Sequence, residues 1–161
     1  GYYDGLGGFS VQASACDLAE VTNTPVILVV NTRGMSLSVL AYIKGFLTFR
    51  EPTRICGVIL NQLSPMLYPK MKEAIEKELG IPVCGYVPRM EDCSLESRHL
   101  GLVLPQEVAQ LSEKLQHIAE VLEDTLDLDQ ILEIGRKAGE VGSFEQAEKE
   151  TCRFAQSLSK Y

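Results

Sequence analysis

The stretch "PVILVVNTRGM", residues 25–35, decides the fold expected for this chain. It opens with a run of Val, Ile and Leu that shows no polar alternation, and a polar turn follows directly. Two further runs have the same form, "ICGVILN" at 55–61 and "IPVCGYVP" at 81–88. Apolar runs of this length, each ended by a turn, are typical of strands buried on both faces of a parallel sheet.

Helical patterns precede and separate these runs. Residues 11–21 and 35–49 carry apolar side chains at helical spacing. Residues 69–80 do so as well, with Pro69 near the start and Gly80 where a left-handed C-cap belongs. The alternation of strand and helix predicts an α/β fold with a partial doubly wound, mainly parallel sheet.

From about residue 105 the pattern is helical only. Five apolar residues spaced three and four apart form a narrow seam, which favours packing against one partner helix: Val108, Leu111, Leu115, Ile118 and Leu122. Asp127 and Ser143, each followed three residues later by a Gln, predict reciprocal capping boxes at two further helices. We therefore expect an α/β domain over residues 1–105 and C-terminal helices over 106–161.

Composition excludes several classes of function. The net charge is −7 and the basic residues are scattered, so neither a nucleic-acid partner nor a basic patch is expected. No apolar run approaches the roughly 18 residues of a membrane span, and no signal peptide is recognisable, so we expect no membrane partner. The five cysteines form no C-x-x-C pair, which fits a reducing, cytoplasmic location and predicts no metal ligands.

Ligands of parallel sheets bind beyond the carboxyl ends of the strands, where this sequence is polar. Arg33 follows the first run and suits a phosphate or carboxylate, or is a solvated turn residue. Asn61 ends the second run, and its amide suits a purine edge or stabilises the turn. After the third run come Arg89, Arg98 and His99, which suit a substrate with several carboxylates or form surface ion pairs.

The first eight residues, "GYYDGLGG", permit two interpretations. They are either a frayed terminus or an active-site loop whose supporting strand precedes it in a longer protein. The sequence contains no phosphate-binding loop of the form G-x-x-x-x-G-K-[ST]. A nucleotide-type sheet without that loop indicates a nucleotide-binding domain that lacks its first part.

Several motifs together resemble one family. They are "YDG" at 3–5, "PVILVVNTRGM" with "KGF" after it, "GVILNQL", "GIPVCGYVPR", "SRHLGL" at 97–102 and "DLDQIL". These segments resemble the ATP-binding domain of cobyrinic acid a,c-diamide synthases, within the wider dethiobiotin-synthetase-like group of P-loop enzymes. The resemblance covers residues 1 to about 135 and implies a P-loop NTPase-like fold that lacks its P-loop.

The resemblance also implies a reaction for the full-length protein. ATP and Mg²⁺ would activate the a and c acetates of a corrinoid substrate as acyl phosphates. A glutaminase domain elsewhere in the full-length chain would supply the ammonia that forms the amides, in cobalamin biosynthesis. This fragment alone is then expected to be inactive, and an exposed sheet edge favours self-association, for instance as a homodimer.

The resemblance assigns roles to individual residues. Asp4 matches an aspartate near the site of phosphoryl transfer and is the expected catalytic residue. Asn61 matches the adenine-reading Asn, and Pro88 with Arg89 matches the loop beside the base. Arg98 and His99 match the "RHLGL" element, which either organises the site or binds substrate carboxylates, and they are expected as substrate-binding residues together with Arg33, which follows the first run.

Two alternative functions stay open at this point. The enzyme could amidate another tetrapyrrole, because no motif in the sequence separates the related substrates. The chain could also be a non-catalytic binding or regulatory module derived from a P-loop ATPase, with its helical seam as a protein interface.

Overall fold

A computed structural model of the chain describes residues 1–90, 93 and 111–140. The chain forms two compact units. Among the described residues, one unit comprises Gly1–Pro25 together with 135–140, and the other lies within Val26–Ile134. The predicted boundary between residues 105 and 106 lies outside the described residues, as does the helix predicted at Ser143, so both stay predictions.

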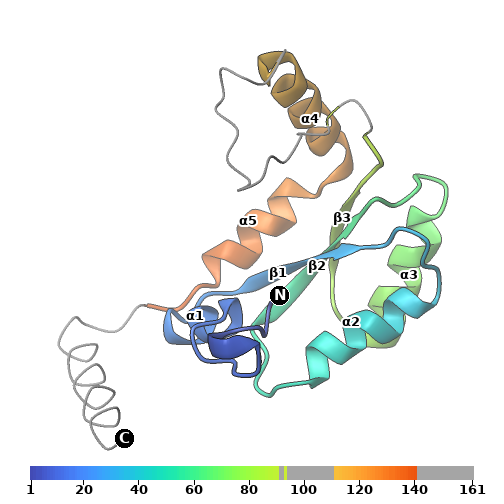
Figure 1. Cartoon of the computed structure of the whole chain (residues 1–161). Helices are drawn as coiled ribbons and strands as arrows, with labels where there is room; N and C mark the ends of the chain where they lie inside the picture. Colours follow the sequence, from blue (N-terminus) through green and yellow to red (C-terminus); the bar gives the residue numbers. More distant parts are fainter. Residues whose placement is uncertain (91–92, 94–110, 141–161) are drawn as a thin grey trace, which may run out of the picture. The chain divides into compact units, whose positions relative to one another are not determined.

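The larger unit contains the parallel sheet that the sequence predicts. Its strands are β1 (Val26–Asn31), β2 (Ile55–Asn61) and β3 (Val83–Val87), in the spatial order β1-β2-β3 (Figure 1). β2 pairs in parallel with both neighbours. All three predicted strands are thereby confirmed, and the fold is α/β.

One face of this sheet carries the core. Register partners on parallel strands point to the same face, and five partners on this face are at most 9% exposed: Leu28, Val30, Val58, Leu60 and Val83. Helices α2 (Ser38–Thr48) and α3 (Tyr68–Leu79) contact each other and lie side by side on one side of the sheet (Figure 1).

The apolar stripes of these helices explain their packing. In α2, Val39 and Ile43 are fully buried, and in α3 Ile75 is fully buried. The predicted stop signal of α3 is confirmed, because its C-cap Gly80 adopts φ 66° and ψ 18°, the left-handed region that glycine enters without steric cost.

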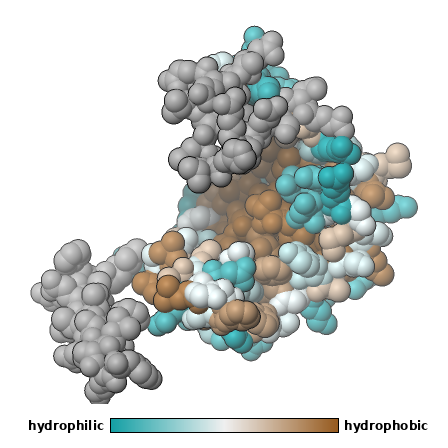
Figure 2. Space-filling model, in the orientation of Figure 1, coloured by the Kyte–Doolittle hydropathy of each residue, from teal (hydrophilic) through white to brown (hydrophobic). Residues whose placement is uncertain are grey.

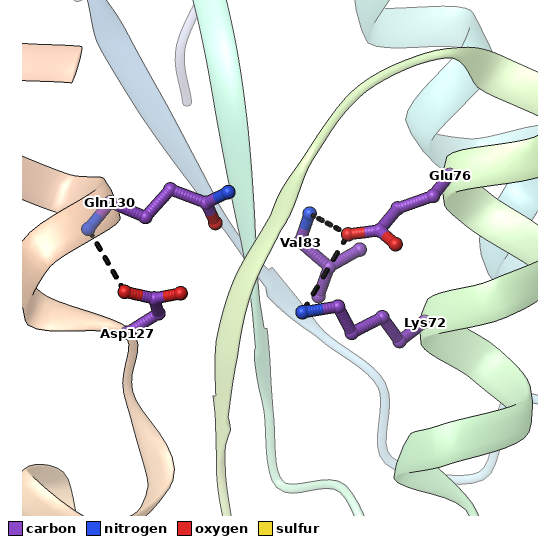
Figure 3. A network of polar contacts seen from close by, with 5 residues as sticks. All are labelled: Lys72, Glu76, Val83, Asp127 and Gln130. Atoms are coloured by element: carbon purple, nitrogen blue, oxygen red, sulfur yellow. Dashed lines mark hydrogen bonds and ion pairs between the residues drawn. The ribbon is translucent and has the colours of Figure 1, made fainter. Parts of the chain in front are cut away.

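A polar contact ties α3 to the strand that follows it (Figure 3). The carboxylate of Glu76 accepts a hydrogen bond from the backbone N–H of Val83 at 3.1 Å. The same oxygen lies 3.7 Å from the ammonium of Lys72, one helical turn earlier. Glu76 thus satisfies the first N–H of β3 from a helix side chain.

The other face of the sheet approaches α5 (Leu128–Arg136) very closely at one point. A Cβ built on Gly57 would lie 2.8 Å from the sulfur of Cys84 and 2.9 Å from Cδ1 of Ile134. Cys84 and Ile134 are themselves buried. Position 57 therefore has no room for a side chain. Because glycine has none, α5 can pack against β2 at this point.

The prediction that every strand is buried on both faces is wrong for β1. Val29 is 59% exposed. Its register partner Ile59 is only partly buried. No described helix covers Val29 on this face, whereas its neighbours Leu28 and Val30 reach the core on the opposite one. An apolar surface is visible on this side of the molecule in Figure 2.

Helix α4 (Leu111–Thr125) contacts β3, but none of its residues is buried, so packing of the predicted seam against a partner helix stays a prediction. Leu115 on that seam is 53% exposed. Among the described helices, none combines the length and the apolar character that crossing a membrane requires.

The capping box predicted at the start of α5 is half right. The carboxylate of Asp127 accepts from the N–H of Gln130 at 2.9 Å, as predicted (Figure 3). The backbone N–H of Asp127, however, donates to the carbonyl of Cys84 at 2.9 Å and not to the Gln130 side chain. Tertiary pairing with β3 replaces the local bond, and Oε1 of Gln130 is buried without a hydrogen-bond partner among the described residues.

In the smaller unit, the opening segment is a folded loop. The N–H of Gly5 donates to the carbonyl of Ser10 at 2.7 Å, and that of Leu6 donates to Gln12 at 2.9 Å around a short 3₁₀ turn (Leu6–Gly8). Helix α1 (Ala15–Val21) follows, with the side chain of Ser14 as its N-cap. The interpretation of this segment as a frayed terminus is therefore wrong.

Replacing glycine by alanine should have opposite effects on stability at Gly57, which is closely packed, and at Gly45, which is surrounded by open space. Gly57→Ala is expected to lower the free energy of unfolding by about 1–3 kcal/mol, because Cys84 and Ile134 must move apart. Gly45→Ala, in the exposed interior of α2 with open space around it, is expected to raise it by about 0.5–1 kcal/mol. Urea unfolding measures both, and an unchanged stability of Gly57→Ala would contradict the close packing.

Burial of two acidic groups predicts a loss of stability in alkali. Burial raises the pKa of the Cys84 thiol above its ordinary 9.0 and that of the Tyr68 phenol above 10.0. The unfolded chain then loses these protons first, so the free energy of unfolding falls as the pH rises above about 9. Urea unfolding at pH 8 and pH 10 should show a smaller fall for Cys84→Ala than for the parent. The matched variant Cys56→Ala, at an exposed cysteine, should keep the full fall.

Candidate binding site at the carboxyl edge of the sheet

Parallel register brings the ends of the three strands to one edge of the sheet. Asn31 pairs with Asn61, and Asn61 pairs with Val87. A pocket of about 560 Å³ lies at this edge, within the size range of small-molecule sites. It is lined by Arg33, Asn61, Gln62, Val87, Pro88, Arg89, Met90, Cys93 and Ile118.

The pocket combines apolar walls with a few polar groups. Val87 and Pro88 come from the end of β3, and Ile118 comes from α4. The two amide side chains, Asn61 and Gln62, follow one another at the end of β2. Such a site offers flat apolar contact to a ring and hydrogen bonds to its edge.

Asn61 is held in place on both its main chain and its side chain. Its carbonyl accepts from the N–H of Thr32 at 2.8 Å and from the Thr32 hydroxyl at 2.9 Å. Its side-chain oxygen accepts from the N–H of Gln62 at 3.0 Å. Gln62 has φ 59°, a left-handed conformation that is uncommon for a residue other than glycine.

Two arginines give the pocket a positive character. Arg33 and Arg89 both line it and both are exposed, and no acidic side chain is among the described residues of its lining. The turn that carries Arg33 is fixed because the side-chain oxygen of Asn31 accepts the N–H of Arg33 at 3.0 Å. An anionic group of a ligand would be attracted to this end of the site.

The structure brings together four of the site residues singled out in the sequence: Arg33, Asn61, Pro88 and Arg89. Asp4 belongs to the other unit, where its carboxylate lies 2.8 Å from the amino group of Gly1. Arg98 and His99 lie outside the described residues. The catalytic and substrate roles expected for these three residues stay predictions.

Five lining residues were not anticipated: Gln62, Val87, Met90, Cys93 and Ile118. Four of them are within four residues of Asn61 or Arg89 in the sequence, so their position next to a strand end is a signal that the sequence contains. Ile118 has no such signal, because only tertiary packing brings α4 to the pocket. Among the described residues, no group of three or more His, Cys, Asp or Glu side chains is placed to hold a metal ion.

Comparison with known proteins decides the family. The family described as "AAA domain" matches residues 4–97, which includes all three strands and most of the pocket lining. The chain belongs to this AAA domain family. The P-loop NTPase-like character of the α/β fold agrees with that membership.

Three curated relatives of this AAA domain chain carry the same name. The "cobyrinate a,c-diamide synthase" of Listeria innocua is 38% identical over 139 residues, which is 86% of this chain and 31% of the relative. Those of Dehalococcoides mccartyi and Priestia megaterium are 40% and 35% identical, over 86% and 83% of this chain. The resemblance to cobyrinic acid a,c-diamide synthases is thereby confirmed.

The chain spans about 30% of the length of these relatives. No solved structure gives a significant match.

Proposed function

We propose that the chain is the nucleotide-binding part of an ATP-dependent amidoligase that amidates the a and c acetates of cobyrinic acid in cobalamin biosynthesis. The observation that carries the proposal is the convergence of Asn61, Pro88 and Arg89 on one pocket at the carboxyl edge of the sheet. Membership of the AAA domain family and the name of its relatives support the same assignment.

The pocket suits the base of ATP. The amide of Asn61 would hydrogen-bond the edge of adenine, while Val87 and Pro88 would pack against its ring. The lining residues thus match a planar, apolar group with polar edges, and the volume of about 560 Å³ accommodates it.

The positive end of the pocket suits an anion. Arg33 and Arg89 would attract either the phosphates of the nucleotide or the carboxylates of the substrate, because guanidinium groups pair well with both. Arg98 and His99 are proposed as further substrate ligands, and Asp4 as a residue that orients the reacting groups.

Bound ATP would supply the phosphoryl group that activates each acetate before ammonia forms the amide. We propose that glutamine is the source of the ammonia, that a glutaminase domain lies elsewhere in the full-length protein, and that the protein is cytoplasmic. Mg²⁺ is the usual companion of transferred phosphates. The described residues offer it no cluster of acidic ligands, so no step is assigned to it in this chain.

The full-length protein tests the overall reaction. With ATP, Mg²⁺ and glutamine, it should form ADP and glutamate only when cobyrinic acid is added, with two amides formed per substrate. Mass spectrometry of the corrinoid counts the amides. Equal turnover with a different tetrapyrrole would indicate that cobyrinic acid is not the specific substrate. Turnover that needs no tetrapyrrole would refute the proposal.

Asn61 tests where the nucleotide binds. Asn61→Ala should weaken binding of ATP about 5- to 20-fold in titration calorimetry, because one or two hydrogen bonds to the base are lost. The control variant is Gln116→Ala, which removes an exposed amide side chain on α4 that does not line the pocket. It should change the affinity less than 3-fold.

Chemical labelling gives an independent location for the nucleotide. Cys93 lines the pocket, whereas Cys56 is exposed on β2 and is not among the lining residues. Saturating ATP should slow alkylation of Cys93 and leave that of Cys56 unchanged. Absence of both ATP binding and protection would favour the non-catalytic module instead.

A further inference from the structure

Thr32 is a buried polar residue whose environment the proposed function does not explain. It is 2% exposed and follows β1 directly. Ser14, the other buried polar residue in the described part of the chain, has a local role as the N-cap of α1. Thr32 caps no helix, and it is not among the residues that line the pocket.

Both polar hydrogens of Thr32 go to the same acceptor. Its backbone N–H and its hydroxyl donate to the main-chain oxygen of Asn61, at 2.8 Å and 2.9 Å. The pairing of β1 with β2 needs only the first of these bonds. The hydroxyl adds a second hydrogen bond to Asn61, the last residue of β2, which is 29 residues away in the sequence.

The chain beyond Asn61 is fixed from the other side as well. The N–H of Leu63 donates to the carbonyl of Val87 at 3.2 Å, and Leu63 is 2% exposed. Gln62 is therefore held between two anchored residues in its left-handed conformation at φ 59°. Strained residues persist where their surroundings fix them on both sides, and they are frequent at ligand sites.

The bond from Gln62 fixes the orientation of the Asn61 amide and leaves its nitrogen as a donor that no described residue uses. The N–H of Gln62 donates to the side chain of Asn61, and only the amide oxygen can accept it. The amide nitrogen has no hydrogen-bond partner among the described residues. Asn61 therefore offers this unused hydrogen-bond donor on a side chain that lines the pocket.

We propose that Thr32 is a positioning residue that holds Asn61 so that its amide nitrogen donates to N1 or N7 of the bound base. The inference rests on the proposed binding of ATP in this pocket. It adds that selectivity for the base depends on one of its acceptor atoms. It also adds that Thr32, a residue outside the pocket, maintains this selectivity.

The alternative is that Thr32 only stabilises the ends of β1 and β2. In that case its removal would weaken folding and weaken all ligands equally. A ratio of affinities separates the two roles, because a loss of stability or of overall affinity cancels in the ratio whereas a misplaced donor does not.

The experiment measures binding of three probes to the full-length protein by titration calorimetry: ATP, 7-deaza-ATP and 1-deaza-ATP. Each analogue lacks one ring nitrogen that can accept a hydrogen bond. The parent protein should bind one of the two analogues about 3- to 10-fold more weakly than ATP, the effect of one lost hydrogen bond.

The variants then assign that preference to Thr32. Thr32→Val keeps the shape of the side chain but lacks the hydroxyl, and it should reduce the preference to less than 2-fold. Thr32→Ser keeps the hydroxyl and should restore it. Asn61→Asp keeps an oxygen for the N–H of Gln62 but lacks the donor, so it should also abolish the preference, which supplies a second readout if Thr32→Val fails to fold.

The other outcomes are separable. If the parent does not bind ATP, the proposed function fails and this inference fails with it. If the parent binds ATP and both analogues equally, the pocket binds nucleotide but Asn61 donates to neither N1 nor N7, and the inference is refuted. If Thr32→Val keeps the parental preference, Thr32 is a structural residue only.

Discussion

The parallel pairing of β2 with both of its neighbours is the constraint on which the rest of this structure depends. It sets Asn31, Asn61 and Val87 at one edge, so that the three segments that follow the strands leave the sheet close together. The pocket is a direct result, since its lining comes mainly from those segments. A register shift of one residue would turn Asn61 to the opposite face and remove its amide from the pocket.

The two faces of the sheet contribute differently to that edge. The face under α2 and α3 is closely packed, with Val58, Leu60 and Val83 inaccessible to solvent. A rigid core of this kind holds the strand ends in fixed positions. On the other face, α5 comes near only because Gly57 has no side chain, and Val29 stays open. The strand ends that form the site are thus fixed mainly by the packing on the α2 and α3 face of the sheet.

Much of this arrangement could be predicted from the sequence, because the decisive signals are local. Apolar runs fix the strands, Gly80 ends α3, and the position of Asn61 directly after a run places it at the carboxyl edge. Other features are tertiary and leave no local trace. Ile118 reaches the pocket through the packing of α4, and the N–H of Asp127 bonds to β3 instead of closing its own capping box. The exposure of Val29 likewise depends on what covers the sheet.

The bond between Glu76 and Val83 has a consequence for the order of folding. It joins residues only seven apart, whereas the bond between Thr32 and Asn61 joins residues 29 apart. Short loops of about ten residues close in roughly 10–100 ns, and longer loops lose more conformational entropy on closure. The segment from α3 to β3 is therefore expected to gain structure early. The edge that forms the pocket would be completed only when β1 docks, which makes the binding site one of the last parts of this unit to mature.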